Sequence, residues 1–173
     1  MDLWRSNVSL ALAWSEHAPA SVRAQRSAAI ALVESGNHEK ALAVLNRAYQ
    51  KHPGSHSILM HRMILKCSLG VDITKDKINL LRIAREEPFN PKLTNLLSLF
   101  VDISTSGKCT QLNSGYTELL LSGLLSNATA KESEGFLHQL FYFKGVVYSH
   151  GAQSSEAERY FVKAIRLRPG WGC

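Results

Sequence analysis

The 173-residue sequence has few of the features that mark flexible linkers, membrane spans or secreted leaders. Its five prolines and eleven glycines are spread along the chain, so no stretch is typical of a long linker. No apolar run reaches the ~18 residues that a membrane-spanning helix needs. The first ten residues, MDLWRSNVSL, lack the basic and then apolar order of a signal peptide. We therefore expect a soluble chain, which is compatible with its being the soluble part of a larger membrane protein.

The composition suits an ordinary globular domain with a basic surface. Hydrophobic residues make up 45% of the chain and charged residues 20%, which is enough for a core and excludes a disordered charged tail. The net charge of +6 favours acidic partners. Because no block of five or six like charges occurs, we expect a solvated basic surface and no nucleic-acid partner.

Residues that support catalysis or metal binding do not form a recognisable set. His52, His56 and His61 invite a metal-site interpretation, but Pro53-Gly54 separates the first two and nothing nearby completes a tetrahedral set. The triplet at 106–108, Ser-Gly-Lys, lacks the earlier glycine and the strand of a phosphate-binding loop. We therefore predict no catalytic, cofactor-binding or metal-binding residues, and no enzyme activity.

Two stretches of the chain repeat the same residue types at the same six offsets. Counted back from a closing proline, each has alanine at −5 and −12, large apolar residues at −8 and −21, and a small residue at −24. The matching residues are Ala29, Leu32, Ala41, Leu45, Ala48 and Pro53, and then Gly145, Tyr148, Ala157, Phe161, Ala164 and Pro169. This pattern resembles the tetratricopeptide repeat, where small residues let two helices pack closely and the proline ends the second helix.

The resemblance implies an all-α fold, a right-handed solenoid of stacked antiparallel helix hairpins. Apolar spacing and cap residues predict about nine helices, over roughly 3–17, 22–35, 38–52, 55–70, 74–87, 90–104, 111–126, 131–150 and 153–168. We expect a single domain over 1–173, with a leading helix at 1–19, hairpin units at 20–53, 54–88, 89–127 and 128–169, and a tail at 170–173. The leading helix is either the second half of an incomplete unit or a dedicated N-terminal cap.

Stacked hairpins of this family curve and present a concave groove lined by the first helix of each pair. The resemblance therefore implies a protein–protein interaction module that holds a peptide or a helix. Carried onto this sequence, the partner-binding positions are Arg23, Arg26, Ile30 and Val33 in the first unit, and Gln139, Tyr142, Val146 and Ser149 in the last. Arg23 and Arg26 would suit a carboxylate, or they are ordinary surface residues.

Two of the three cysteines occupy related places in consecutive predicted units. Cys67 and Cys109 each fall at or just past the end of a first helix, and stacked units would bring these ends together. A disulfide between them would close a loop of about 43 residues, worth roughly 4 kcal/mol in the chain-entropy model, and would indicate an oxidising compartment. The alternative is two reduced, buried cysteines that act as small apolar residues.

Short motifs give a second resemblance, to the repeat tails of bacterial polytopic membrane proteins that handle lipid-linked sugars or transfer glycans. The motifs are Leu3-Trp4, Ala13-Trp14, Pro19-Ala20-Ser21-Val22-Arg23-Ala24, and the spacing Cys67-x2-Gly70 with Gly107-x-Cys109. This resemblance implies a periplasmic or extracytoplasmic location and covalent attachment to an upstream membrane domain. The alternatives are a cytosolic scaffold or cochaperone domain, and a basic solenoid that binds nucleic acid.

Overall fold

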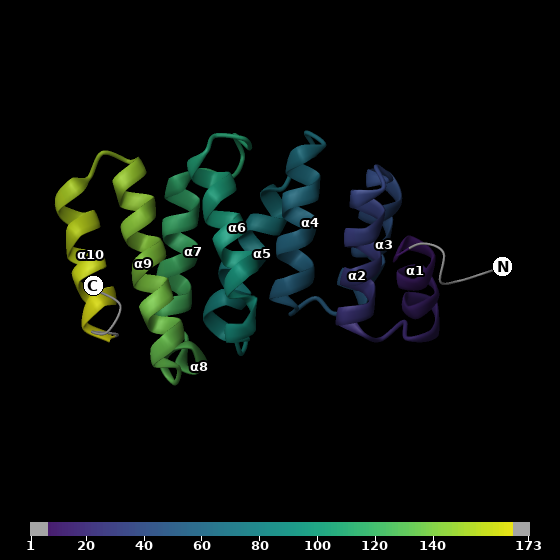
Figure 1. Cartoon of the computed structure of the whole chain (residues 1–173), viewed down its shortest axis with the longest axis horizontal. Coiled ribbons are helices and arrows are strands. Elements are labelled where there is room, and N and C mark those ends of the chain that lie inside the picture. The colour runs from purple at the N-terminus through teal and green to yellow at the C-terminus, as the bar shows by residue number, and fades with distance from the viewer. Residues whose placement is uncertain (1–6, 168–173) are drawn as a thin grey trace. The chain divides into compact units, whose positions relative to one another are not determined.

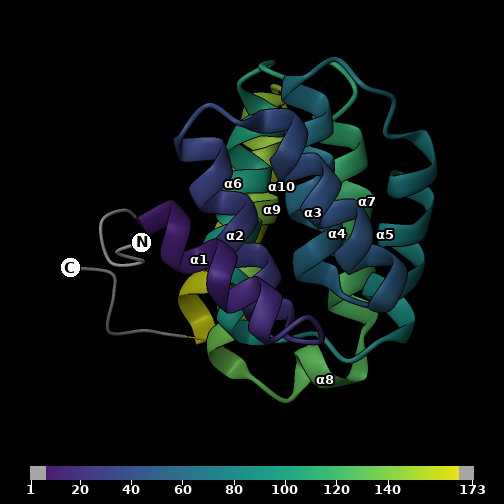
Figure 2. The ribbon, with the colours of Figure 1, turned by 90° about the vertical axis from the view of Figure 1, so that its right-hand side faces the viewer.

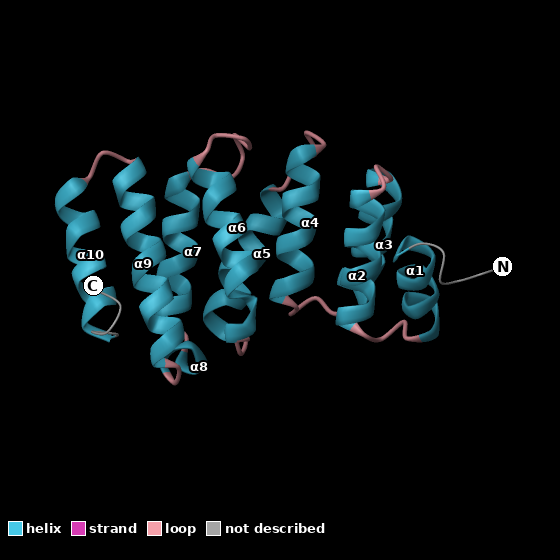
Figure 3. Ribbon diagram, in the orientation of Figure 1, coloured by secondary structure: helices cyan, strands magenta, loops and turns pink. Residues whose placement is uncertain are grey.

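The computed structural model describes residues 7–167, and within them every regular element is a helix (Figure 1, Figure 3). The predicted Leu3-Trp4 motif, Pro169 and the tail with Cys173 lie outside the described residues. The helices are α1 (Asn7–His17), α2 (Val22–Glu34), α3 (His38–Lys51), α4 (His56–Ser68), α5 (Thr74–Glu86), the short 3-10 helix η2 (Pro91–Leu93), α6 (Thr94–Thr105), α7 (Ser114–Ser126), α8 (Ala128–Lys131), α9 (Glu134–His150) and α10 (Ser154–Leu167). The predicted all-α fold of helix hairpins is confirmed.

The chain divides into two compact units, Met1–Val71 with α1–α4 and Asp72–Cys173 with α5–α10. The division falls between α4 and α5, inside the hairpin unit 54–88 that the sequence predicts. The single domain over 1–173 and the four hairpin boundaries stay predictions.

In the first unit, α2 packs against both α1 and α3, and α3 packs against α4 (Figure 2). Side chains of Ser21 and Ser55 cap α2 and α4, accepting hydrogen bonds from Ala24 N at 3.2 Å and Ile58 N at 3.4 Å. Small residues at the crossing allow this close packing. The core consists of Ala28, Ala29, Leu32, Ala41, Val44, Leu45, Ala48, Ile58 and Leu65. Every member that the repeat pattern placed in the first stretch before Pro53 is therefore buried.

In the second unit, α9 and α10 form a closely packed antiparallel hairpin, and α7 packs against α5 and α9. Gly145 lies against the ring of Phe161, and a Cβ atom at this position would be 2.5 Å from Phe161 Cε1. Ala157 and Ala164 are also buried. The small residues of the second repeat stretch thus serve the close helix crossing that the pattern predicts.

The described chain has ten α-helices, where the sequence predicted about nine. The additional helix is α8, a single turn that separates α7 from α9. Asn127 starts it, because its side-chain oxygen accepts a hydrogen bond from Thr129 N at 3.0 Å. At the start of the segment predicted as a helix over 90–104, the Asn90 side-chain oxygen accepts a hydrogen bond from Lys92 N at 3.0 Å, and the first turn after it is 3-10.

Candidate functional site

The predicted partner-binding residues of the first unit form one strip along α2. Arg23, Arg26, Ile30 and Val33 follow each other at spacings of three and four residues, which places them on one face of the helix. Ile30 is 38% exposed and Val33 is 37% exposed, while the other side of α2 is buried in the core. The strip therefore offers apolar surface next to two cationic groups.

The two arginines of the strip have different neighbours. The Arg23 guanidinium lies 5.8 Å from the centre of the Trp14 ring, so it contacts α1. Arg26 donates a hydrogen bond to Ser57 Oγ at 3.3 Å, so it reaches α4. Arg23 and Arg26 lie on the same face of α2, but their guanidinium groups contact different helices. Their binding of a carboxylate stays a prediction.

His61 lies close to Arg26, and its pKa is lower than its ordinary value. Its Nδ1 atom is 2.8 Å from the main-chain oxygen of Ser57. Burial lowers the pKa of His61, the Ser57 hydrogen bond opposes this, and the Arg26 charge lowers the pKa further. The lowered pKa favours the neutral form of His61 and leaves the positive charge here on the Arg26 guanidinium.

The predicted residues of the last unit form a second strip, on α9. Gln139, Tyr142, Val146 and Ser149 again follow at spacings of three and four. Tyr142 is 49% exposed, and its ring lies 5.8 Å from that of Phe161. The Ser149 hydroxyl donates to the Val146 oxygen of its own helix at 2.8 Å. Tyr142 therefore provides an exposed aromatic surface on this strip.

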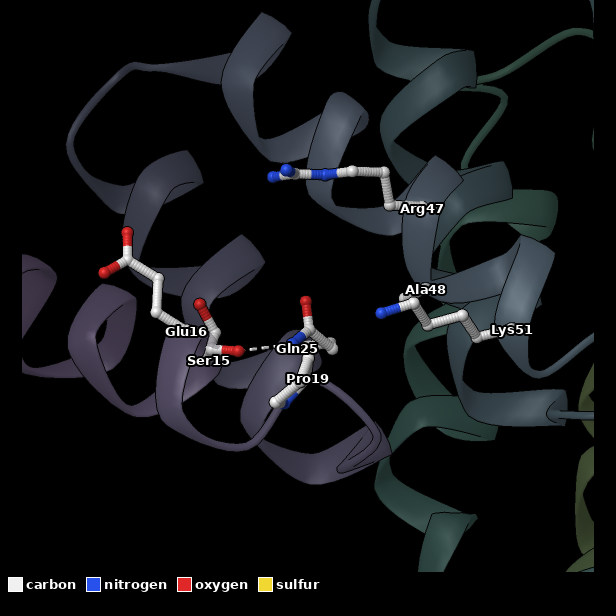
Figure 4. Close-up of a pocket in the computed structure, with 7 residues that line it drawn as sticks. All are labelled: Ser15, Glu16, Pro19, Gln25, Arg47, Ala48 and Lys51. Carbon is white, nitrogen blue, oxygen red and sulfur yellow. Dashed lines mark hydrogen bonds between the residues drawn. The ribbon is translucent and has the colours of Figure 1, made fainter.

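A cavity with a volume of about 150 Å³ lies between α1, α2 and α3, and no sequence pattern predicts it (Figure 4). Gln25 forms its floor and donates a hydrogen bond from Nε2 to the main-chain oxygen of Ser15 at 2.8 Å. Arg47 and Lys51 extend over it from α3, and Glu16 stands on the α1 side.

A buried ion pair in the second unit was also missed. The Lys144 ammonium donates to Glu118 Oε1 and to Ser122 Oγ, each at 2.7 Å, and lies 4.7 Å from the centre of the Tyr160 ring. Burial disfavours both charged forms, but hydrogen bonds between the partners outweigh it. They lower the pKa of Glu118 and raise that of Lys144.

Cys67 and Cys109 are both disulfide-bonded, and Cys109 is 5% exposed. In residues 7–167, no three His, Cys, Asp or Glu side chains lie close enough together to hold a metal ion. Over the same residues, no helix has both the length and the apolar character needed to cross a membrane.

These features define a helical repeat scaffold whose exposed helix faces carry mixed apolar and basic side chains. Residues 22–65 match the family model described as Tetratricopeptide repeat, and this segment covers α2, α3 and most of α4. Repeats of this family generally mediate protein–protein interactions and are typically not enzymes. No curated protein matches the chain.

Proposed function

We propose that this chain binds a protein partner, as an extended peptide or a helix, through the α2 strip of Arg23, Arg26, Ile30 and Val33. The observation that carries the proposal is the exposure of Ile30 and Val33, both above one third, within the segment that matches the repeat family. Apolar side chains flanked by cations suit an amphipathic partner with acidic flanks. The α9 strip with Tyr142 is a further contact surface, because exposed tyrosines are frequent anchors in interfaces.

Site-specific crosslinking tests the α2 strip. A photoreactive phenylalanine analogue is placed at Val33 and, as a matched control, at the exposed residue Ala43 of α3. In an extract of the source organism, the Val33 probe should capture a protein that the Ala43 probe does not. Equal capture from both positions, or none from Val33, would count against the strip.

Substitution of a strip residue then tests how much it contributes to the affinity for the captured partner. Ile30→Asp should weaken binding about ten-fold or more, since it replaces an apolar contact with a charged group that loses its water on binding. Ile78→Asp makes the same change at the 64% exposed Ile78 of α5 and should leave the affinity unchanged. Equal losses for the two variants would contradict the proposal.

We also infer that the chain works outside the cytoplasm, as a soluble part of a larger bacterial membrane protein. The disulfide-bonded state of Cys67 and Cys109 supports this inference, since such bonds persist in oxidising compartments. Acid quenching of intact cells, followed by alkylation and mass mapping, gives the redox state in vivo. Oxidised cysteines are expected, whereas reduced cysteines would favour a cytosolic scaffold.

A further inference from the structure

The cavity between α1, α2 and α3 has a polar floor whose acceptor is unused. Gln25 is 9% exposed, and its side-chain nitrogen is fixed by the hydrogen bond to the Ser15 main-chain oxygen at 2.8 Å. The amide oxygen therefore points away from Ser15, toward the side where α3 lies (Figure 4). None of the described residues donates a hydrogen bond to it. Solvent in the cavity reaches this acceptor, so a ligand that displaces the solvent must itself donate a hydrogen bond to it.

Two cations cover the same cavity from α3. Arg47 and Lys51 are both exposed, stand one helical turn apart, and extend toward the Gln25 side in Figure 4. Neither forms an ion pair with a described residue, although Glu16 stands on the opposite wall. A planar guanidinium and an ammonium at this spacing present many hydrogen-bond donors to one anionic group.

We propose that this cavity binds an acidic side chain of a peptide. Its carboxylate lies between Arg47 and Lys51, and a main-chain N–H of the same peptide donates to the Gln25 amide oxygen. The volume of about 150 Å³ has room for the end of one aspartate or glutamate side chain. The acceptor floor favours a peptide over a free phosphate, because the peptide supplies a main-chain N–H donor beside its carboxylate.

This subsite is separate from the α2 strip. Gln25 is buried toward α1, whereas Ile30 and Val33 are on an exposed face of the same helix. Substitutions in the strip leave the cavity intact, and substitutions of Arg47 or Lys51 leave the strip intact. Failure of one proposal therefore does not imply failure of the other.

NMR titration of the isotopically labelled full chain tests the proposal. The probe is N-acetyl-glutamate-N-methylamide, and its neutral match is N-acetyl-glutamine-N-methylamide. The glutamate probe should cause saturable shifts of the Gln25 side-chain amide and of the Arg47 Nε–H signal, and the glutamine probe should not. Arg47→Gln and Lys51→Gln should each weaken binding up to about five-fold, the loss expected for one exposed ionic contact.

Lys40→Gln is the matched control, because it removes an equal charge from the same side of α3 two turns from Arg47. The affinity of the Lys40→Gln variant for the glutamate probe should stay within about two-fold of that of the unaltered chain. Three outcomes would overturn the proposal: no saturable shift up to the solubility limit of the probe, equal shifts from both probes, or tighter binding of inorganic phosphate at the same signals. Thermal melts check that each variant is folded under the conditions of the titration.

Discussion

The Lys144 ammonium lies 2.7 Å from Glu118 Oε1 and joins α9 to α7 through a charge that is almost completely out of water. The Lys144 side chain is 4% exposed and that of Glu118 is 26% exposed. Ser122 and the Tyr160 ring complete the surroundings of the ammonium. An ammonium buried in this way is stable only while its acceptors are in place, so the stability of the second unit depends on the charge of one carboxylate.

The free energy of unfolding should therefore fall on acidification. Because the pKa of Glu118 is lower in the folded chain than its ordinary value of 4.5, its contribution is present above pH 4.5 and is lost as the pH falls through the folded-state pKa. One such group changes the unfolding free energy by at most about 1.4 kcal/mol per pH unit. Urea unfolding at several pH values should show a weaker acid dependence for Glu118→Gln.

Glu86→Gln is the control for this measurement. Glu86 pairs with Arg82 at 2.8 Å, but the two side chains are 60% and 49% exposed, and exposed pairs of this kind contribute little. An acid dependence reduced equally in both variants would show that Glu118 is not the controlling group.

Gly145→Ala should destabilise the second unit, because the new methyl group would meet Phe161 at 2.5 Å. Overpacking of this kind costs about 1–3 kcal/mol, which exceeds the roughly 1 kcal/mol gained from helix propensity. Gly115→Ala is the matched substitution, since its Cβ would lie 3.6 Å from the nearest atom. In chemical denaturation, the free energy of unfolding of Gly145→Ala should be lower than that of the unaltered chain. Equal stability of Gly145→Ala and Gly115→Ala would contradict the close approach of Gly145 to Phe161.

Asn127→Ala should cost about 2–3 kcal/mol, because Asn127 does more than start α8. Its buried side-chain nitrogen donates to the main-chain oxygens of Ala84 at 3.0 Å and Glu87 at 2.8 Å, and so fixes the end of α5. Asn113→Ala removes only a cap bond to Tyr116 N at 2.9 Å and should cost about 1 kcal/mol. Similar losses in denaturation for the two variants would argue against this second role.

The cysteines should resist alkylation in the folded chain without reductant, and mass mapping should recover one crosslinked peptide that contains Cys67 and Cys109. Reduction should lower the melting temperature, since a disulfide that closes about 43 residues is worth roughly 4 kcal/mol. Alkylation of both cysteines in a chain that remains folded would contradict the pairing.

Local chemistry made the helices predictable. Ser21 and Ser55 cap α2 and α4, which begin within one residue of the predicted starts at 22 and 55. Gly36, with a positive φ of 79°, follows the end of α2, which lies within one residue of the predicted end at 35. The repeat pattern also identified Gly145 as a packing position, because its offset from the proline matched that of Ala29. These features depend on residues close in sequence or on a fixed repeat spacing.

The missed features depend on partners far away along the chain. Lys144 stands in an aromatic stretch, and nothing local indicates that Glu118, 26 residues earlier, reaches it. Asn127 belongs to an Asn-Ala-Thr triplet that has the form of a glycosylation acceptor, yet its partners are carbonyl groups about 40 residues away. The function of Gln25 depends on a main-chain oxygen of α1, which no pattern of side chains reveals.

The alanine and glycine residues at the helix crossings determine how the helices pack, whereas other positions form the exposed helix faces. Ala41 and Ala48 in one hairpin, and Gly145 and Ala157 in another, fix how the helices approach each other without using the outward faces. Those faces differ, since α2 displays arginines where α9 displays a glutamine and a tyrosine. Substitutions on these exposed faces should therefore change the surface chemistry of one helix at little cost in stability.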